Sequence, residues 1–591
     1  MQSRDRDYDT LATDVLIIGA GAAGLRAAIE LSRAGVDTLV VGKSPHGDAH
    51  TVWAAGGINA SLGSRDPEDR WDIHAADTIG EGHYVTDPQA VQTLARQAPE
   101  RIRELYDWGC PFSLTEDGEI DQRYFGAQSF RRTCFAGDRT GEAILNTLVD
   151  KAREENVPYR ENVYITKLLS SSANTNGSYP DESRVTGAAG YDLNTGRRLL
   201  FSARAVVLAA GGLTSLYERS SSRTGENTGD AMALAYEAGA ALRDMEFVQF
   251  HPTGMVEPEE MAGMLVTEAV RGEGGRLYNA DGERFMQRYS PEHMELDARD
   301  VVARANYREI QRGRGTEGNA VLLDVSHKDA SYIKERLPRM YEQFAGLGVD
   351  ITREPMKVSP TAHYAMGGIK VDFGTMRTTV PGLYAIGEAT AGVHGANRLG
   401  GNSLAETVVF GKVLADHLLE NLDSLPRSIP DEAEAANHFA DLDSLEASEG
   451  EREPGELIRE LRRLVWDHGG IVRSAGGLDE GLDKLRKLEE KARSLNVAGT
   501  PADRGLEQAM NLRFMLTSAE AVLRGARLRQ ESRGAHHRED FQYESPEWQR
   551  TILYARGAEG MKLWTEPVGE IPPRIQKALD QDYSLDYHHL E

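Results

Sequence analysis

The chain has 591 residues, and 67 basic against 93 acidic side chains give it a formal net charge of −26. This charge opposes binding to a phosphate backbone, which calls for a basic stripe, so we exclude a nucleic-acid partner. Hydrophobic residues make up 40% of a chain that also holds 60 glycines, which is typical of a globular protein and excludes a wholly disordered or fibrous one.

The first predicted unit is a strand, a glycine-rich turn, a helix and a second strand. DVLII at 14–18 has the pattern of a buried parallel strand, and GAGAAG follows at once at 19–24. A helical apolar stripe then ends at Gly35, and TLVV at 38–41 is the second strand. This order predicts the βαβ unit of a Rossmann-like domain.

The turn carries the spacing G-x-G-x-x-G, made by Gly19, Gly21 and Gly24. Such glycines permit a tight turn, the approach of a pyrophosphate to the backbone, and close packing of the helix on the strand. We therefore predict dinucleotide binding. The acidic residue that usually takes the ribose hydroxyls is missing, because VGK stands at 41–43. The absence of this acidic residue argues against a nicotinamide dinucleotide and is compatible with FAD as the bound dinucleotide.

Two further apolar segments, at 203–212 and 380–389, read as strands that each end in glycine. The segment between them is polar, so we expect roughly 236–354 to be an inserted second domain. The acidic run at 430–456 is predicted to be a linker, and the helical periodicity at 457–528 predicts a bundle. The serine-rich stretch at 170–183 is expected to be a surface loop.

The two cysteines, Cys110 and Cys134, form no CxxC pair, which excludes a disulfide framework and a cysteine-ligated iron–sulfur cluster within this chain. No metal site is predicted. The first nine residues lack an apolar region, and the uncharged stretch 205–217 is too short to cross a bilayer. We expect a soluble, cytoplasmic chain. Its strong acidity favours a halophilic source, since a highly charged surface keeps proteins soluble in salt.

The segment GDAHTVWAAGGINASLG at 47–63 resembles the flavin-contacting segment of succinate dehydrogenase and fumarate reductase flavoprotein subunits. The resemblance runs nearly end to end. Its further motifs are FGAQSFRRTCFAGDRTG (125–141), TGD (228–230), FVQFHPTG (247–254), LVTEAVRGEGG (265–275), ARDVVARA (298–305), PTAHYAMGGI (360–369), GLYAIGEA (382–389) and HGANRLGGNSL (394–404).

The resemblance implies an α/β fold in which a Rossmann-like FAD-binding domain is interrupted by an α+β capping domain. A helical domain and a C-terminal α/β piece follow. The implied ranges are 1–235 and 355–430 for the FAD-binding domain, 236–354 for the capping domain, 440–535 for the helical domain and 536–591 for the C-terminal segment.

By the same resemblance, FAD is the cofactor, and His50 occupies the position where this family attaches it covalently. A covalent bond raises the flavin potential, so that a weak reductant such as succinate can reduce the flavin. The residues expected to contact FAD are Gly19, Ala20, Gly21, Ala23, Gly24, Lys43, Ser44, His50, Thr51, Gly56, Gly57, Asp230, Glu388, Ser403 and Leu404.

A small dicarboxylate needs two sets of binding side chains, one for each carboxylate, which we call clamps. Arginine suits a clamp because its planar guanidinium matches the two oxygens of a carboxylate and stays charged. The resemblance assigns Arg398 and His363 to one carboxylate, and His251 and Thr267 to the other. These four side chains are the predicted substrate-binding residues.

The resemblance makes Arg299 the group that moves a proton to or from the substrate, with Glu268 and Arg271 as its relay to solvent. Thr267, Glu268 and Arg271 would lie within one turn if helical. A guanidinium with a pKa above about 12 is a poor base. In a pocket of closely packed charges, electrostatic coupling lowers the free-energy cost of deprotonating the guanidinium. The alternative is that Arg299 and Arg304 merely pair with Asp300 and its neighbours.

The implied activity is the interconversion of succinate and fumarate, a step of the tricarboxylic acid cycle, by hydride transfer at FAD. The implied partners are an iron–sulfur subunit and membrane-anchor subunits that pass electrons to a quinone. The expected location is therefore the cytoplasmic side of the cell membrane, reached only through those subunits.

L-Aspartate oxidase, a soluble relative, is the main alternative. By resemblance it carries a glutamate where this chain has Phe125, and it generally lacks the flavin-linking histidine. A phenyl ring leaves a substrate ammonium unpaired, which is costly. A non-catalytic FAD scaffold would lack the clamp and relay residues, which are all present here. A nicotinamide-linked dehydrogenase would carry an acidic or phosphate-pairing residue after the second strand, where this chain has Gly42.

Overall fold

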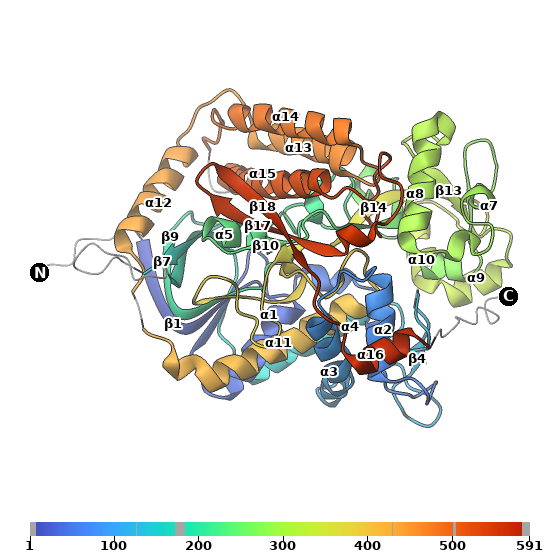
Figure 1. Cartoon of the computed structure of the whole chain (residues 1–591), viewed down its shortest axis with the longest axis horizontal. Helices are drawn as coiled ribbons and strands as arrows, with labels where there is room; N and C mark the ends of the chain where they lie inside the picture. The colour runs from blue at the N-terminus through green and yellow to red at the C-terminus, as the bar shows by residue number, and fades with distance from the viewer. Residues whose placement is uncertain (1–7, 126, 172–183, 428, 500–503, 582–591) are drawn as a thin grey trace, which may run out of the picture.

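The computed structural model describes residues 8–125, 127–171, 184–427, 429–499 and 504–581, so the predicted loop at 170–183 lies almost wholly outside the described residues. A body built on a twisted sheet carries a helical layer along one side, and a smaller outer region projects at the end away from α12 (Glu432–Glu446) (Figure 1). The helices of the body are α1 (Ala22–Arg33), α2 (Trp71–Glu81), α3 (Pro88–Asp107), α4 (Thr140–Glu154), α5 (Asp230–Glu237), α11 (Asn402–Asn421) and α16 (Pro573–Leu579).

The largest sheet has the strand order β6-β2-β1-β9-β8-β7, and a further strand, β16, also pairs with β9. β1 lies parallel to β2 and β9, whereas β8 is antiparallel to both β7 and β9. These strands are β1 (Tyr8–Ile18), β2 (Thr38–Val41), β6 (Tyr159–Arg160), β7 (Val163–Ser170), β8 (Val185–Asp192), β9 (Arg198–Leu208) and β16 (Leu383–Ala385). The predicted βαβ unit and Rossmann-like fold are confirmed.

The glycine-rich turn has the form that its sequence predicts at two positions. Gly19 has a φ of +114°, and a Cβ there would lie 2.2 Å from the carbonyl oxygen of Ala209. A Cβ on Gly24 would lie 2.1 Å from the carbonyl oxygen of Gly19. Only glycine fits either position, so α1 begins directly against the carboxyl ends of the strands.

The outer region, residues 255–358, has a hydrophobic core of its own, which includes Met255, Phe285, Leu323 and Val358. An antiparallel sheet in the order β11-β14-β13-β12 joins this region to the body. Its strands are β11 (Val248–Met255), β12 (Arg276–Tyr278), β13 (Val321–Asp324) and β14 (Met356–Ala365). The helices of the outer region are α6 (Ala269–Gly272), α7 (Met286–Tyr289), α8 (Arg299–Glu309), α9 (Ala330–Arg336) and α10 (Pro338–Gly346).

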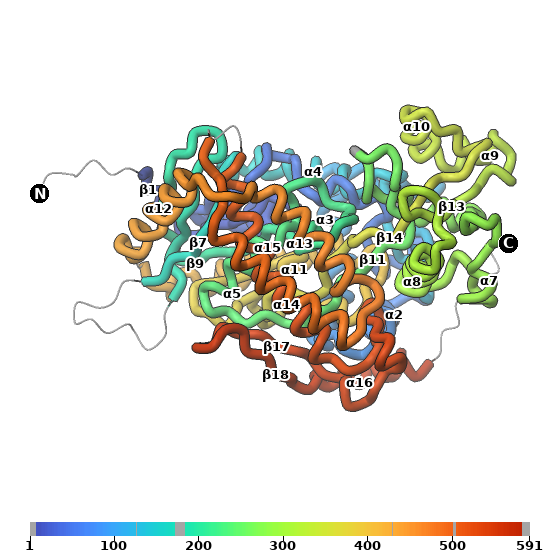
Figure 2. The backbone as a smooth tube through the Cα atoms, turned by 90° about the horizontal axis from the view of Figure 1, so that it is seen from above, coloured from blue at the N-terminus to red at the C-terminus, as the bar shows by residue number. Residues whose placement is uncertain are grey.

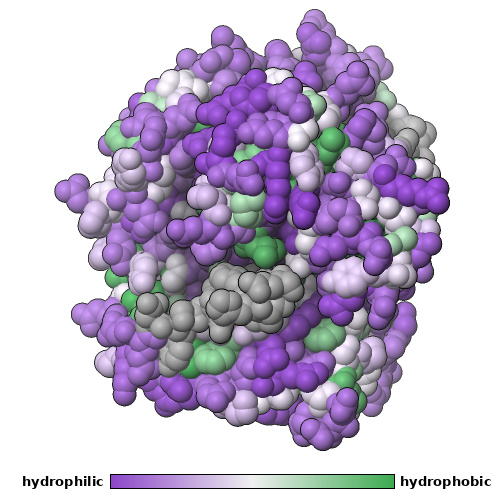
Figure 3. All heavy atoms as spheres, turned by 90° about the vertical axis from the view of Figure 1, so that its right-hand side faces the viewer, coloured by the Kyte–Doolittle hydropathy of each residue, from purple (hydrophilic) through white to green (hydrophobic). Residues whose placement is uncertain are grey.

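In the view from above, α9 and α10 project at the edge of the outer region, and α8 and β14 lie next to the body (Figure 2). The end of the molecule that the outer region forms is mainly hydrophilic, with hydrophobic side chains scattered over it (Figure 3). Scattered apolar residues of this kind are normal on a folded surface.

Four helices follow the body: α12 (Glu432–Glu446), α13 (Pro454–Gly469), α14 (Ala475–Lys491) and α15 (Gly505–Leu528). The last three pack side by side, as the predicted bundle requires. The prediction that 430–456 is a linker is wrong for α12. Ala435, Phe439 and Leu442 are buried at helical spacing, and Asp431 caps the helix by accepting from two backbone N–H groups. The many acidic residues concealed this stripe.

The C-terminal strands β17 (Arg550–Gly557) and β18 (Gly560–Pro567) return to the body (Figure 1). They extend a small sheet through β10 (Leu242–Arg243) and β15 (Gly368–Ile369). A third small sheet holds β3 (Ile58–Asn59), β4 (Gln122–Arg123) and β5 (Thr133–Cys134). Within the described ranges, no helix is both long and apolar enough to cross a membrane.

Candidate active site

A cleft of about 1440 Å³ runs between the body and the outer region. It exceeds the usual size of a small-molecule pocket, about 300–1,000 Å³, and is large enough for a dinucleotide together with a small substrate. Of the predicted site residues, only Gly24 and Arg271 do not line it. Those that do are Gly19, Ala20, Gly21, Ala23, Lys43, Ser44, His50, Thr51, Gly56, Gly57, Asp230, His251, Thr267, Glu268, Arg299, His363, Glu388, Arg398, Ser403 and Leu404.

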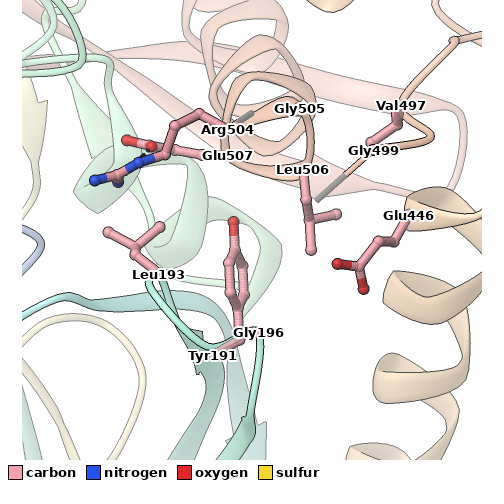
Figure 4. A pocket seen from close by; sticks show the side chains of 10 residues that line it. All are labelled: Tyr191, Leu193, Gly196, Glu446, Val497, Gly499, Arg504, Gly505, Leu506 and Glu507. Carbon is pink, nitrogen blue, oxygen red and sulfur yellow. Dashed lines mark hydrogen bonds and ion pairs between the residues drawn. The ribbon is translucent and has the colours of Figure 1, made fainter. Parts of the chain in front are cut away.

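A second pocket lies where β8 meets the start of α15, between Tyr191, Glu446 and Arg504 (Figure 4). Its volume is only about 20 Å³. That is room for a single water molecule, so this pocket is no candidate for a cofactor or substrate.

The end of the cleft at β1 and β2 fits the phosphates and ribose of a dinucleotide. Gly21 stands at the N-terminus of α1, and a Cβ on it would meet nothing closer than 3.4 Å. Lys43 Nζ donates to Asp230 Oδ2 at 2.7 Å and lies 4.4 Å from the centre of the Tyr164 ring. The N-terminus of α11, which begins at Asn402, also lies at the cleft. Free helix N–H groups of this kind favour anions.

His50 opens a short 3₁₀ turn at 50–53 and lines the cleft. Its Nδ1 lies 3.6 Å from Glu226 Oε2, and neither buried atom has a hydrogen-bond partner among the described residues. Glu226 also contacts Arg223. Burial alone would raise the pKa of Glu226, but the contacts with His50 and Arg223 outweigh it and hold that pKa at about 2. A charged carboxylate therefore stands beside Nδ1 of His50.

Strand pairing brings the two predicted clamp histidines together. His251 lies on β11 and His363 on β14, and their ring centres are 5.7 Å apart. His363 is the extra residue of a β-bulge, because Tyr364 pairs with Gln249 while Ala362 pairs with Phe250. A bulge re-aims a side chain, here toward the cleft.

Both histidines are neutral near pH 7. Burial lowers the pKa of His251 well below its usual value, and Arg299 and Arg271 lower it further. Burial and the charge of Arg398 do the same to the pKa of His363. A neutral imidazole retains one N–H donor, which suits it to a carboxylate oxygen.

Arg398 is a buried cation with little to neutralise it. It is only 3% exposed, its Nη1 donates to Ser403 Oγ at 3.1 Å, and its Nε has no partner in the described part of the chain. The Tyr364 ring lies 4.5 Å from its guanidinium carbon. Burial and the nearby Arg299 lower the pKa of Arg398 to about 10. An anion in the cleft would supply the missing partner.

Arg299, the first residue of α8, is held on both sides. Its Nε and Nη2 donate to Glu268 Oε2 at 2.9 and 2.8 Å, and its Nη1 lies 3.4 Å from Gln249 Oε1. Burial acts to raise the pKa of Glu268, but Arg299 and Arg271 outweigh it and hold that pKa at about 2. Arg271 Nη2 lies 3.8 Å from the same carboxylate oxygen, and Arg271 Nη1 donates to the carbonyl of Glu295 at 2.5 Å.

Two details of the sequence-based picture change. Thr267 and Glu268 do not lie within a helix with Arg271, since α6 begins only at Ala269 and Glu268 is its N-cap. The alternative pairing with Asp300 is correct for Arg304, whose Nη1 donates to Asp300 at 2.6 Å, and wrong for Arg299, which pairs with Glu268.

Phe125 completes the wall beside Arg299. Its ring centre is 5.3 Å from the guanidinium carbon, and it lines the cleft. A Cβ added at Gly56 or Gly400 would collide with this ring. The ring is therefore packed tightly where a substrate would lie.

Side chains that were not predicted also lie near the site, and three of them extend the contacts of Arg299 and His363. Gln249 contacts Arg299, Asn397 precedes Arg398 and contacts Gln249, and Ser221 Oγ lies 3.1 Å from His363 Nδ1. Gln249 stands two positions before His251 on the same strand, and strand alternation is a signal that would have found it. No pattern in the sequence points to Ser221.

Comparisons with known proteins agree with this geometry. Residues 14–404 match the family described as "FAD binding domain", and residues 458–576 match "Fumarate reductase flavoprotein C-term". The chain is 44% identical over 553 residues to a fumarate reductase (CoM/CoB) subunit of Methanothermobacter marburgensis, covering 92% of this chain and 97% of that protein. It is 37% identical to the succinate dehydrogenase flavoprotein subunit of Coxiella burnetii, covering 92% and 94%.

Solved structures give the same result. Mycobacterium smegmatis Sdh1 in complex with UQ1 superposes with a TM-score of 0.88 at 37% identity, covering 99% of this chain and 100% of that one. A quinol–fumarate reductase with menaquinol molecules has a TM-score of 0.88 at 33% identity, covering 96% and 100%. This chain therefore belongs to the succinate dehydrogenase and fumarate reductase flavoprotein family.

Proposed function

We propose that this chain interconverts succinate and fumarate at a bound FAD. The observation that carries the proposal is the charge at the outer end of the cleft. Arg299, Arg271 and Arg398 are buried there, and Glu268 is the only carboxylate among the described residues that pairs with any of them. An excess of buried positive charge calls for an anionic ligand, and a dicarboxylate supplies two charges.

The carboxylates of the substrate are held at two places. Arg398 and His363 bind one, and His251 and Thr267 bind the other. An arginine fork offers two parallel N–H donors to a carboxylate, and each charge-assisted bond is worth about 1.5–3 kcal/mol. FAD, when bound, accepts or gives the hydride at one substrate carbon.

Arg299 moves the proton at the neighbouring carbon, and Glu268 and Arg271 relay it. Support comes from the contact of Arg299 Nε and Nη2 with Glu268, and of Glu268 with Arg271. The low pKa of Glu268 keeps it ionised, so it holds Arg299 in place. We propose that the outer region acts as a cap whose closure excludes water from this transfer.

Phe125 favours a dicarboxylate over an amino acid. A substrate ammonium beside Phe125 and Arg299 would meet an uncharged ring and a cation, and an unpaired buried charge is unfavourable. L-Aspartate oxidation is therefore the weaker candidate.

FAD is attached to His50 in this proposal. The carboxylate of Glu226, 3.6 Å from Nδ1, supports it, because its negative charge favours the tautomer with the proton on Nδ1, which leaves the Nε2 lone pair free. We expect the unfolded protein to keep its flavin fluorescence in a denaturing gel. His50→Ala should lose that fluorescence, retain FAD in the native state and oxidise succinate poorly. Release of all flavin from the wild-type chain on unfolding would contradict the attachment.

The partners proposed are an iron–sulfur subunit and membrane-anchor subunits, through which electrons reach a quinone. This places the chain at the cytoplasmic side of the cell membrane and its reaction in the tricarboxylic acid cycle. The similarity to succinate dehydrogenase and quinol–fumarate reductase structures supports this assembly. We also propose a halophilic source, on the basis of the net charge of −26.

The test uses the purified chain, loaded with FAD and kept anaerobic. Succinate should bleach the oxidised flavin band, fumarate should restore it, and L-aspartate should leave it unchanged. Phe125→Glu is the matched variant, and it should weaken the response to succinate. Bleaching by aspartate, with peroxide formed when air is admitted, would assign the chain to the oxidase branch instead.

A further inference from the structure

A buried chain of hydrogen bonds links Arg299 to a carboxylate at the far side of the site wall. Arg299 Nη1 faces Gln249 Oε1 at 3.4 Å, and Gln249 Nε2 donates to Asn397 Oδ1 at 2.8 Å. Asn397 Nδ2 in turn donates to Glu81 Oε1 at 2.7 Å. Both amide side chains are at most 1% exposed.

The groups at the two ends of this chain of hydrogen bonds determine which side chain donates and which accepts at each step. A guanidinium can only donate and an ionised carboxylate can only accept, whereas an amide has one end of each kind. Glu81 therefore requires the NH₂ group of Asn397, whose oxygen then requires the NH₂ group of Gln249. That leaves the oxygen of Gln249 facing Arg299. The second N–H of Gln249 donates to the carbonyl of Arg398 at 3.0 Å.

The backbone around Glu81 is strained in a way that keeps this contact. Glu81 ends α2, and the residues after Gly82, His83 and Tyr84, both have φ above +50°. Consecutive left-handed residues other than glycine are costly and cluster at functional positions. Ala396 N donates to the Gly82 carbonyl at 3.0 Å, which holds this turn against the segment that carries Asn397.

Glu81 is also placed where a carboxylate reduces stability. A negative charge at the C-terminus of a helix opposes the helix dipole. Burial raises the pKa of Glu81 to about 7, and Asp300 and Glu268 add to this effect, whereas His83 and Arg299 oppose it. Residues that disfavour folding are often retained for function.

We propose that Glu81 is a positioning residue for Arg299, which it orients through the amides of Asn397 and Gln249. This inference rests on the proposed proton transfer by Arg299. It also predicts a pH dependence. An ionised Glu81 accepts the Asn397 N–H in a charge-assisted hydrogen bond, which is stronger than the bond to a protonated, neutral Glu81, so the chain holds Arg299 most firmly above neutral pH.

The test compares kcat for succinate oxidation in the wild type and in Glu81→Gln, with FAD bound. The ratio of the two should be near one at about pH 6 and about tenfold at about pH 8.5, with KM changed less than about twofold. The melting temperature of Glu81→Gln should equal or exceed that of the wild type, because a charge at the helix C-terminus is removed. A kcat ratio that does not change with pH overturns the proposal.

Glu544→Gln is the matched control, since Glu544 contacts His83 in the same turn but has no place in the chain to Arg299. Its pH profile should match that of the wild type, and a tenfold loss equal to that of Glu81→Gln would overturn the proposal. A second variant, Asn397→Asp, sets a carboxylate against Glu81, so the pair shares a proton and the kcat inflection moves to higher pH. An unmoved inflection overturns the proposal. If the wild type shows no response to succinate at any pH, the proposed function fails instead.

Discussion

Two groups of buried charges in this molecule are built in opposite ways. Behind β10 and β17, Arg529 is fully buried, and each of its side-chain nitrogens is bonded. Its acidic partners are Glu246 at 2.7 Å, Glu531 at 3.1 Å and Asp244 at 3.4 Å. At the cleft and directly behind its wall, by contrast, Arg398 Nε and two nitrogens of Arg271 have no hydrogen-bond partner within the described ranges.

The pKa values follow the same division. Burial alone would lower the pKa of Arg529, but Glu246 and Asp244 outweigh it and raise that pKa. Burial lowers the pKa of Arg398 to about 10, and Arg299 contributes to the decrease. A balanced cluster stabilises the fold, whereas an unbalanced one is unfavourable until an anion binds. The difference separates the structural arginines from the proposed functional ones.

The largest expected effect comes from removing the cleft arginine that is paired most closely. Arg299→Ala should lower kcat by about 10²–10⁴-fold, the contribution typical of a positioned acid or base, because the proposed proton transfer loses its donor and acceptor. Bound FAD should be unchanged in its absorbance, and rapid-mixing measurements of flavin reduction report the rate. Arg304→Ala, on the same helix but paired with Asp300, is the control. Normal turnover by Arg299→Ala would contradict the proton-transfer role.

Breaking the balanced cluster should affect stability instead. Arg529→Met leaves Glu246 buried without its cation, which costs about 3–5 kcal/mol of the free energy of unfolding. Denaturant unfolding measures it. Arg574→Met is the control, because Arg574 is 58% exposed and its pair with Asp72 should contribute less than about 1 kcal/mol. Equal losses in the two variants would remove the distinction between them.

The matched substitution in the cleft should have the reverse outcome. Arg398→Met removes a buried and poorly paired charge, so the free energy of unfolding should stay the same or rise. Affinity for succinate should fall by about 2–3 kcal/mol, because a charge-assisted clamp is lost. Titration of the flavin spectrum with a dicarboxylate measures the affinity. A destabilisation as large as that of Arg529→Met would mean that Arg398 serves the fold.

The turn at 19–24 could be predicted because local backbone geometry dictates its residues. A φ of +114° at Gly19 and the contact of Gly24 with the strand admit only glycine, so the motif and the structure carry the same information. The helix α12 was missed for the opposite reason. Its buried stripe of Ala435, Phe439 and Leu442 is sparse, and acidic residues dominate the rest of the segment.

The chain from Glu81 to Arg299 could not be predicted from the sequence. Its members come from the end of α2, from β11, from the loop before α11 and from the start of α8. Only tertiary packing brings such distant segments together, and no spacing along the sequence records it. His363 is a similar case, since the bulge that aims it depends on how β11 and β14 pair.

A change in salt concentration should have the smallest effect on stability. It distinguishes the exposed charges of the surface from both groups of buried charges. The net charge of −26 makes the folded chain repel itself, and at about 1 M salt the Debye length falls to about 3 Å. We expect the melting temperature to rise by about 1 °C between about 0.05 and 1 M KCl, equivalent to about 1 kcal/mol for a chain of this length. Buried pairs are screened far less than exposed ones. The difference in unfolding free energy between the wild type and Arg529→Met should therefore stay constant across this range, measured by denaturant unfolding at each concentration. If that difference shrinks with salt, the Arg529 cluster is open to solvent, and the contrast between the two buried groups fails. A melting temperature that falls with salt would contradict the proposed halophilic source.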